Sequence, residues 1–152
     1  MLNARRPLKI LFATTHPHMP QIAGGLQAST ADSMRMLSAR GHDTRLLCGL
    51  TGDGLLGLRH RVSLKLGRGR IATDASGGVA TYRAWHSGAP DVAAEVCARF
   101  SPDILLAQGG GAVHLAATFG GLGVPAVIQF RNVEFGGLAE AVKALEAKRR
   151  AS

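Results

Sequence analysis

The chain has 152 residues, of which 46% are hydrophobic and 18% charged, and this balance excludes a disordered or coiled-coil protein. Its length suits a single domain, residues 1–152, that buries a core without disulfides or metal. The net charge of +8 suggests nucleic acid as a partner, but an aromatic content of 5% makes that unlikely, because few side chains can stack on bases.

The sequence shows neither a membrane-spanning segment nor a secretory signal peptide. No apolar run approaches the roughly 18–20 residues of a membrane-spanning helix. The apolar stretch at residues 8–13 is interrupted by Lys9 and is too short for the core of a signal peptide. Cys48 and Cys97 each lie in an apolar run, which predicts two buried thiols in a reducing compartment. We therefore expect a cytoplasmic protein.

The first part of the chain predicts a strand, a loop, a helix and a second strand. Residues 8–14 form an almost uninterrupted apolar run, typical of a strand buried on both faces of a parallel sheet. A loop over 16–25 precedes a helix over 26–40, which Gly41 ends as a left-handed cap. Residues 45–49 predict a short buried strand. The apolar stripe of the helix consists of Leu26, Thr30, Met34 and Leu37.

The middle of the chain is rich in glycine. Residues 49–59 predict a loop. Residues 62–66 and 79–85 alternate between apolar and polar, which predicts a hairpin with Gly77 and Gly78 near its turn.

The remainder alternates between helix and strand. The expected elements are a helix over 90–100 with Val92, Val96 and Phe100 on one face, a strand over 104–107, a helix over 112–119, a strand over 125–130, a loop over 131–137 and a helix over 138–150. The whole predicts an α/β fold with a single Rossmann-like, doubly wound and mostly parallel sheet.

Such sheets bind ligands at the carboxyl ends of their strands, where the direction of winding changes. Three polar or glycine-rich loops occupy that edge: 15–25, 108–111 and 131–137. In the first, Gly24 and Gly25 directly precede a helix, whose free amides and macrodipole favour an anion such as a phosphate. The alternative is that these two glycines only make a tight turn.

The other two loops supply the remaining candidate residues. Gln108, Gly109 and Gly110 are candidates for ligand binding. Arg131 and Glu134 are the catalytic candidates, because Arg131 can clamp a phosphate or carboxylate and Glu134 can accept sugar hydroxyls or act as a base. Arg131 and Asn132 are also candidates for ligand binding. The alternative is a local ion pair between Arg131 and Glu134 that holds the loop.

No metal or organic cofactor is expected. His16 and His18 could share a metal, but no third ligand is visible, and a solvated loop is the alternative. The Gly24-Gly25 loop is not the G-x-G-x-x-G fingerprint of dinucleotide binding, and the sequence has no G-x-S-x-G, P-loop or H-E-x-x-H motif. His42 follows a helix cap and is expected to have a structural role. His114 is either packed or in contact with a ligand.

Residues 55–70 contain basic side chains and no acidic ones. Repulsion between these charges and the flanking glycines predict a mobile or weakly packed excursion from the sheet. We expect the segment to face an anionic acceptor or an anionic membrane surface, and the alternative is a solvated hairpin arm. The basic residues are Arg59, Arg61, Lys65, Arg68 and Arg70.

Four segments together carry a resemblance to a known family. They are the loop ending at Gly24-Gly25, the helix end at 37–42 (LSARGH), the strand at 101–106 (SPDILL) and the strand at 123–128 (GVPAVI). Over about residues 8–138 the chain resembles the N-terminal domain of GT-B glycosyltransferases of family 4.

The resemblance implies a retaining transfer of sugar from a nucleotide-sugar donor, usually without a metal. In the family the N-terminal domain holds the acceptor and the C-terminal domain holds most of the nucleotide. Gly24 and Gly25 match the family's loop beside the donor diphosphate. Arg131 stands where family members commonly have a histidine, and Gln108 stands where some members have one. Both differences suggest a subgroup with an Arg-Asn-x-Glu loop.

The family also has a second, donor-binding domain that this sequence does not contain. Residues 147–152 resemble an interrupted helix. We therefore expect a fragment or truncated form that is inactive alone. The alternative is a stand-alone Rossmann-like module that binds a phosphorylated or nucleotide ligand.

Overall fold

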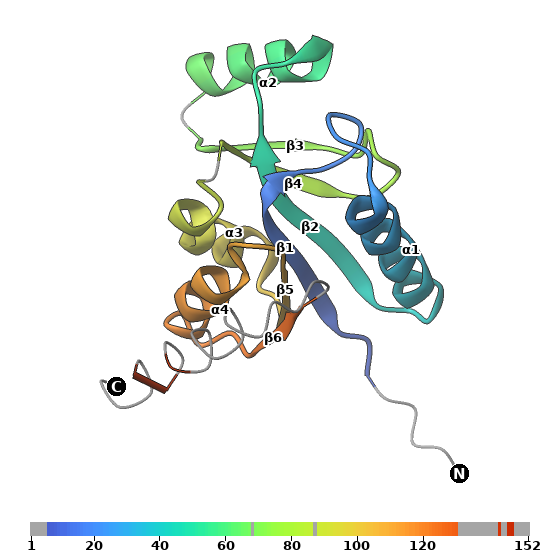
Figure 1. Cartoon of the computed structure of the whole chain (residues 1–152), viewed down its shortest axis with the longest axis vertical. Coiled ribbons are helices and arrows are strands. Elements are labelled where there is room, and N and C mark those ends of the chain that lie inside the picture. Colours follow the sequence, from blue (N-terminus) through green and yellow to red (C-terminus); the bar gives the residue numbers. More distant parts are fainter. Residues whose placement is uncertain (1–5, 68, 87, 131–142, 144–145, 148–152) are drawn as a thin grey trace.

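The computed structural model describes residues 6–67, 69–86, 88–130, 143, 146 and 147, and in this part of the chain a six-stranded sheet has the order β3-β4-β2-β1-β5-β6 (Figure 1). The elements are β1 (Lys9–Pro17), α1 (Gly25–Ala39), β2 (Asp43–Leu50), α2 (Gly54–Leu66), β3 (Ile71–Asp74), β4 (Thr81–Trp85), the 3-10 helix η1 (Pro90–Val92), α3 (Ala93–Phe100), β5 (Ile104–Gln108), α4 (Ala112–Gly120) and β6 (Ala126–Gln129).

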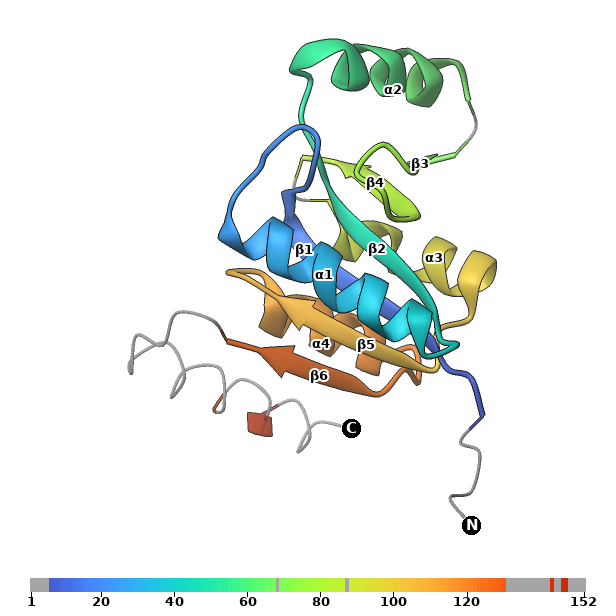
Figure 2. The same cartoon turned by 90° about the vertical axis from the view of Figure 1, so that its right-hand side faces the viewer.

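The sheet is parallel except for β3, which pairs antiparallel with β4 at one edge. Helix α1 covers one face, and α3 and α4 cover the other (Figures 1 and 2). Side chains of β1 alternate between the two layers, as the period of a strand requires. Ile10 and Phe12 pack on the side of Met34 in α1, whereas Leu11 packs on the side of Leu115 in α4. The expected α/β, Rossmann-like architecture is therefore confirmed.

Helix α1 ends as its sequence predicts. Gly41 has a φ of +91°, and its amide donates to the carbonyl of Ser38. The amide of His42 donates to the carbonyl of Leu37 at 3.2 Å, which completes a Schellman motif. The ring Nδ1 of His42 accepts a hydrogen bond from the amide of Leu8 at 3.1 Å. His42 thus ties the end of α1 to the start of the first strand, which confirms its structural role.

The middle of the chain corrects the sequence prediction. Of residues 49–59 only 51–53 form a loop, and 62–66 are not a strand, because β2 continues to Leu50 and α2 spans Gly54–Leu66. The hairpin instead pairs β3 with β4, and Asp74 lies opposite Thr81 across its turn. Gly57 accounts for part of the error. A Cβ there would lie 2.5 Å from the carbonyl oxygen of Thr51, so this glycine lets α2 pack against the preceding turn.

The cysteines, the end of β1 and the C-terminal part of the chain agree only in part with the sequence predictions. Cys48 is fully buried as expected, but Cys97 is only half-buried. The first strand continues to Pro17, so His16 belongs to a strand and not to the loop after it. The loop over 131–137 lies outside the described residues, as does most of the helix expected over 138–150. No helix in the described part of the chain has the length and apolar character to cross a bilayer.

Candidate functional site

The end of β1 and the loop that follows β5 meet where the winding of the sheet changes direction. Strand β1 lies between β2 and β5, and the chain proceeds from β1 to β2 on one side and from β5 to β6 on the other. A Cβ on Gly111 would lie 2.2 Å from Cγ2 of Thr15, and one on Gly109 would lie 3.2 Å from Cδ2 of His16. Gly109 also has a φ of +75°. These glycines therefore permit a close approach of the loop after β5 to the end of β1, which larger residues would prevent.

An open crevice of about 420 Å³ lies beside this contact. We call it the switch-point crevice. It is lined by Thr15, His16, Pro90, Asp91, Gly110, Gly111 and His114. The side chains of His16, Asp91 and His114 are exposed to it. Two imidazoles and a carboxylate can exchange hydrogen bonds with the hydroxyl groups of a bound ligand.

The crevice includes only some of the expected residues. Gly110 lines the crevice. Gly109 lies against His16, and the ring of His16 forms part of the crevice wall. His114 faces the crevice, which favours ligand contact over packing. Asp91 was missed, because it lies in a 3-10 turn that no sequence motif marks.

Gly24 and Gly25 stand at the start of α1 as expected. Gly24 is the N-cap, with no side-chain hydrogen bond to cap the helix, and α1 begins at Gly25. Both glycines are exposed, and a Cβ on Gly25 would have no neighbour within 4 Å. The first amides of α1 therefore have no capping side chain, and the space beside Gly25 is open, as close approach of an anion requires. Neither glycine lines the switch-point crevice as the described residues form it.

Gln108 points under α1 and away from the crevice. It is 2% exposed, and the hydroxyl of Thr30 donates to its Oε1 at 2.8 Å. Its Nε2 and the Nδ1 of His18 have no hydrogen-bond partner among the described residues, and both residues line one cavity of about 10 Å³. Gln108 therefore joins β5 to α1, and contact with a ligand in the crevice is not its observed role.

His16 and His18 do not form a metal pair. His16 is exposed beside the crevice, whereas His18 is buried and its Nε2 lies 3.1 Å from the carbonyl oxygen of Gln27. Burial lowers the pKa of His18 below its usual range, so the ring is neutral and donates through Nε2. Within the described ranges, no three His, Cys, Asp or Glu side chains gather closely enough to hold a metal ion.

A buried polar cluster supports the loop that leads from β1 to α1. Arg83 on β4 is completely buried, and its Nε donates to Oδ2 of Asp74 at 2.6 Å. Its Nη2 donates to the carbonyl oxygen of Met19 at 2.7 Å. The ring Nε2 of His60 on α2 lies 2.9 Å from the same Asp74 oxygen. These contacts fix α2 and the β1–α1 loop against the hairpin.

The carboxyl group of Asp74 is strongly acidic in this cluster. Its burial raises its pKa, but hydrogen bonds from Arg83, the amide of Ser76 and His60, with the charge of Arg83, outweigh that effect and lower the pKa to about 2. Asp74 is therefore a carboxylate that neutralises Arg83. Sequence spacing did not indicate this cluster, since its members come from three separate elements.

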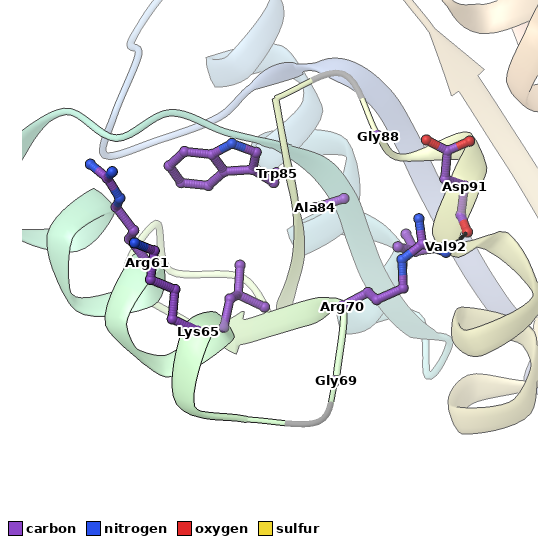
Figure 3. A pocket seen from close by; sticks show the side chains of 10 residues that line it. Arg61, Lys65, Gly69, Arg70, Ala84, Trp85, Gly88, Asp91 and Val92 are labelled. Atoms are coloured by element: carbon purple, nitrogen blue, oxygen red, sulfur yellow. Dashed lines mark hydrogen bonds between the residues drawn. The ribbon is translucent and has the colours of Figure 1, made fainter.

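A second depression of about 550 Å³ lies between α2 and the carboxyl end of β4 (Figure 3). We call it the basic groove. Its lining residues are Arg61, Leu64, Lys65, Gly69, Arg70, Ala84, Trp85, Gly88, Asp91 and Val92. Asp91 lines both depressions, so the basic groove and the switch-point crevice adjoin. The basic segment predicted from sequence thus supplies Arg61, Lys65 and Arg70 to a concave surface.

The rest of the basic segment differs from the prediction. Arg59 is exposed on α2 outside the groove, and Arg68 lies outside the described residues. The alternative of a solvated hairpin arm is wrong, because most of the segment is helix α2, whose outer face is apolar. Exposed side chains follow one another at helical spacing on that face. They are Leu55 (88% exposed), Leu58 (57%), Val62 (48%) and Leu66 (84%).

The sequence matches no protein-family model and no curated protein. The two depressions and the start of α1 are therefore the features that indicate a function.

Proposed function

We propose that this chain is the acceptor-binding N-terminal domain of a retaining glycosyltransferase that uses a nucleotide-sugar donor. The observation that carries the proposal is the switch-point crevice, where His16, Asp91 and His114 surround an open space at the carboxyl edge of a Rossmann-like sheet. Open α/β sheets bind ligands at this position. A wall of imidazole, carboxylate and glycine backbone suits a ligand rich in hydroxyl groups.

The start of α1 supports the donor side of the proposal. The uncapped amides after Gly24 and the open space beside Gly25 can receive an anion such as the donor diphosphate. Arg131, Asn132 and Glu134 keep the roles suggested by the sequence, and they follow β6 outside the described residues. A second domain would close over this edge, because sugar transfer requires groups that orient the donor and stabilise the leaving diphosphate.

We include attachment to an anionic membrane surface in the proposal. Positions 55, 58, 62 and 66 form an exposed apolar stripe on α2. At 3.6 residues per turn, Arg59 borders one side of this stripe and Lys65 the other. A helix with an apolar face flanked by basic residues is typical of helices that lie in the interface of a bilayer.

The alternative is a stand-alone module that binds a phosphorylated or nucleotide ligand, and the basic groove favours it. Titration of the ¹⁵N-labelled chain with UDP and, separately, with UDP-glucose distinguishes the two proposals. The acceptor-domain proposal expects weak binding that perturbs the amides of residues 25–28, and no sugar transfer to a panel of glycosides. Robust sugar transfer by this chain alone would overturn the two-domain proposal, and tight, saturable UDP binding would establish the alternative.

A further inference from the structure

We propose that the basic groove is a binding site for a phosphorylated sugar, with its phosphate on Arg61 and Lys65 and its ring on the indole of Trp85. Under the proposed function this ligand is the acceptor, and that assignment alone rests on it. The cations and the indole of the groove support binding independently of the proposed function.

The charges in the groove favour a phosphate. Arg61 and Lys65 project from neighbouring turns of α2, and neither forms an ion pair with any described residue. Arg70 lies across from them, and its Nη1 donates to the backbone carbonyl of Asp91 at 3.3 Å (Figure 3). Arg61 and Lys65 therefore present two neighbouring cations without acidic partners, and such cations attract an anion. Guanidinium groups bind phosphate oxygens through paired, charge-assisted hydrogen bonds.

Trp85 supplies the flat apolar surface that a sugar ring needs. It ends β4 and is 36% exposed, although the strand before it is buried. Its ring packs edge-on to His86, with 4.8 Å between the ring centroids. Figure 3 shows the indole near Arg61 and Lys65, with Arg70 farther away beside Val92. An indole that is half covered and half open can pack on the C–H face of a pyranose ring.

Asp91 gives the groove its direction. Its carboxylate lies at the end of the groove that adjoins the switch-point crevice. A phosphate is repelled there, whereas hydroxyl groups can donate to the carboxylate. A ligand is therefore oriented with its phosphate toward α2 and its hydroxyl groups toward the crevice. A sugar phosphate has this polarity.

The free sugar phosphate and a lipid-linked sugar share this chemistry. Glucose 1-phosphate represents the first source. Its butyl diester represents the second, since a lipid is attached through a phosphodiester. Unmodified glucose is the uncharged control.

Trp85 is the chain's one tryptophan, so its fluorescence reports directly on the groove. We expect glucose 1-phosphate to change Trp85 emission saturably, glucose to have little effect, and added salt to weaken binding. Stronger binding of the butyl diester would assign the lipid-linked source, and weaker binding the free one.

The decisive variant is Arg61→Gln combined with Lys65→Gln. Both side chains are exposed, so the fold is retained, and we expect affinity to fall by about tenfold or more from the loss of charge-assisted hydrogen bonds. The matched control is Arg59→Gln, which changes one charge of the same helix outside the groove. Circular dichroism verifies folding.

Equal affinity of the double variant and the native chain would overturn the proposal, as would an equal loss of affinity in Arg59→Gln. Tighter binding of UDP than of either sugar phosphate would assign the groove to nucleotides and overturn the choice of ligand.

Discussion

Arg83 and Asp74 form a buried ion pair within the β3–β4 hairpin, with Nε and Oδ2 2.6 Å apart and side-chain exposures of 0% and 8%. Arg83 also donates to the carbonyl oxygens of His18 and Met19. The pair therefore holds the loop that carries the chain from β1 toward Gly24. A buried pair of this kind contributes mainly when every polar atom has a partner, and the carbonyl groups of the loop provide those partners.

Replacing Asp74 with Asn should lower the free energy of unfolding by about 3–5 kcal/mol, because Arg83 is left buried without a counter-charge. Urea denaturation followed by circular dichroism measures the change. The matched control is Asp32→Asn, which breaks an exposed pair with Arg35 and should cost less than about 1 kcal/mol. Equal stability of the two variants would show that the buried pair does not hold the fold.

The same carboxylate makes stability depend on acid pH. The pKa of Asp74 is lowered from 3.8 to about 2 in the folded chain. A carboxyl group with a lowered pKa contributes its full stability above its unfolded pKa and loses it as the pH falls through the folded pKa. We expect the free energy of unfolding to fall between about pH 4 and pH 2. The slope in that window should be shallower in Asp74→Asn, and an unchanged slope would assign acid lability to other groups.

The two cysteines should differ in reactivity. Burial raises the pKa of Cys48 to about 12, although the charge of Arg83 opposes the shift. Burial also raises the pKa of Cys97, but this thiol is only half-buried. Because the thiolate is the reactive form, a maleimide at pH 7.5 should label Cys97 well before Cys48. In Cys97→Ser, labelling should require urea, and rapid labelling of the native variant would show that Cys48 is accessible.

The parts of the fold that the sequence predicted depend on local patterns. The apolar run at residues 8–14 indicates β1 because both faces of that strand are covered, and Gly41 marks the end of α1 because its left-handed conformation suits glycine. The glycines at 52, 54 and 57 were interpreted as a loop because close packing, which is the role of Gly57, leaves no local signature.

The candidate site was predictable only to the level of its loops. Glycines after a buried strand located the switch point, but the direction of Gln108 depends on Thr30, 78 positions away. The Asp74–Arg83 pair likewise arises from tertiary packing, as does the placement of Asp91 and Trp85 in one groove. Neither distance nor direction between such residues is encoded in their spacing along the chain.

The basic segment 55–70 should bind anionic vesicles. Changing Arg59, Arg61, Lys65, Arg68 and Arg70 to Gln should reduce co-sedimentation with vesicles that contain phosphatidylglycerol, since each basic residue near such a surface contributes on the order of 1 kcal/mol. Replacing Leu55 and Leu66 with Ser should reduce it as well, because these exposed side chains form part of the apolar stripe. Neutral vesicles are the control. Equal partitioning of the native chain and the five-residue variant would remove the membrane role.

Gly25→Val tests the start of α1. A Cβ at this position has no neighbour within 4 Å, so the fold should survive with a small change in melting temperature. The valine side chain would block close approach of an anion to the first amides of the helix, and binding of UDP or pyrophosphate, measured from the amide shifts of residues 25–28, should weaken. The matched control is Gly120→Val at the end of α4, where a Cβ also has no neighbour within 4 Å and no anion site is expected. A Gly25→Val chain that folds and binds diphosphate normally would show that the two glycines only make a turn. In that case the basic groove becomes the principal candidate for the phosphate-binding surface of this chain, because its cations remain available regardless of how α1 begins.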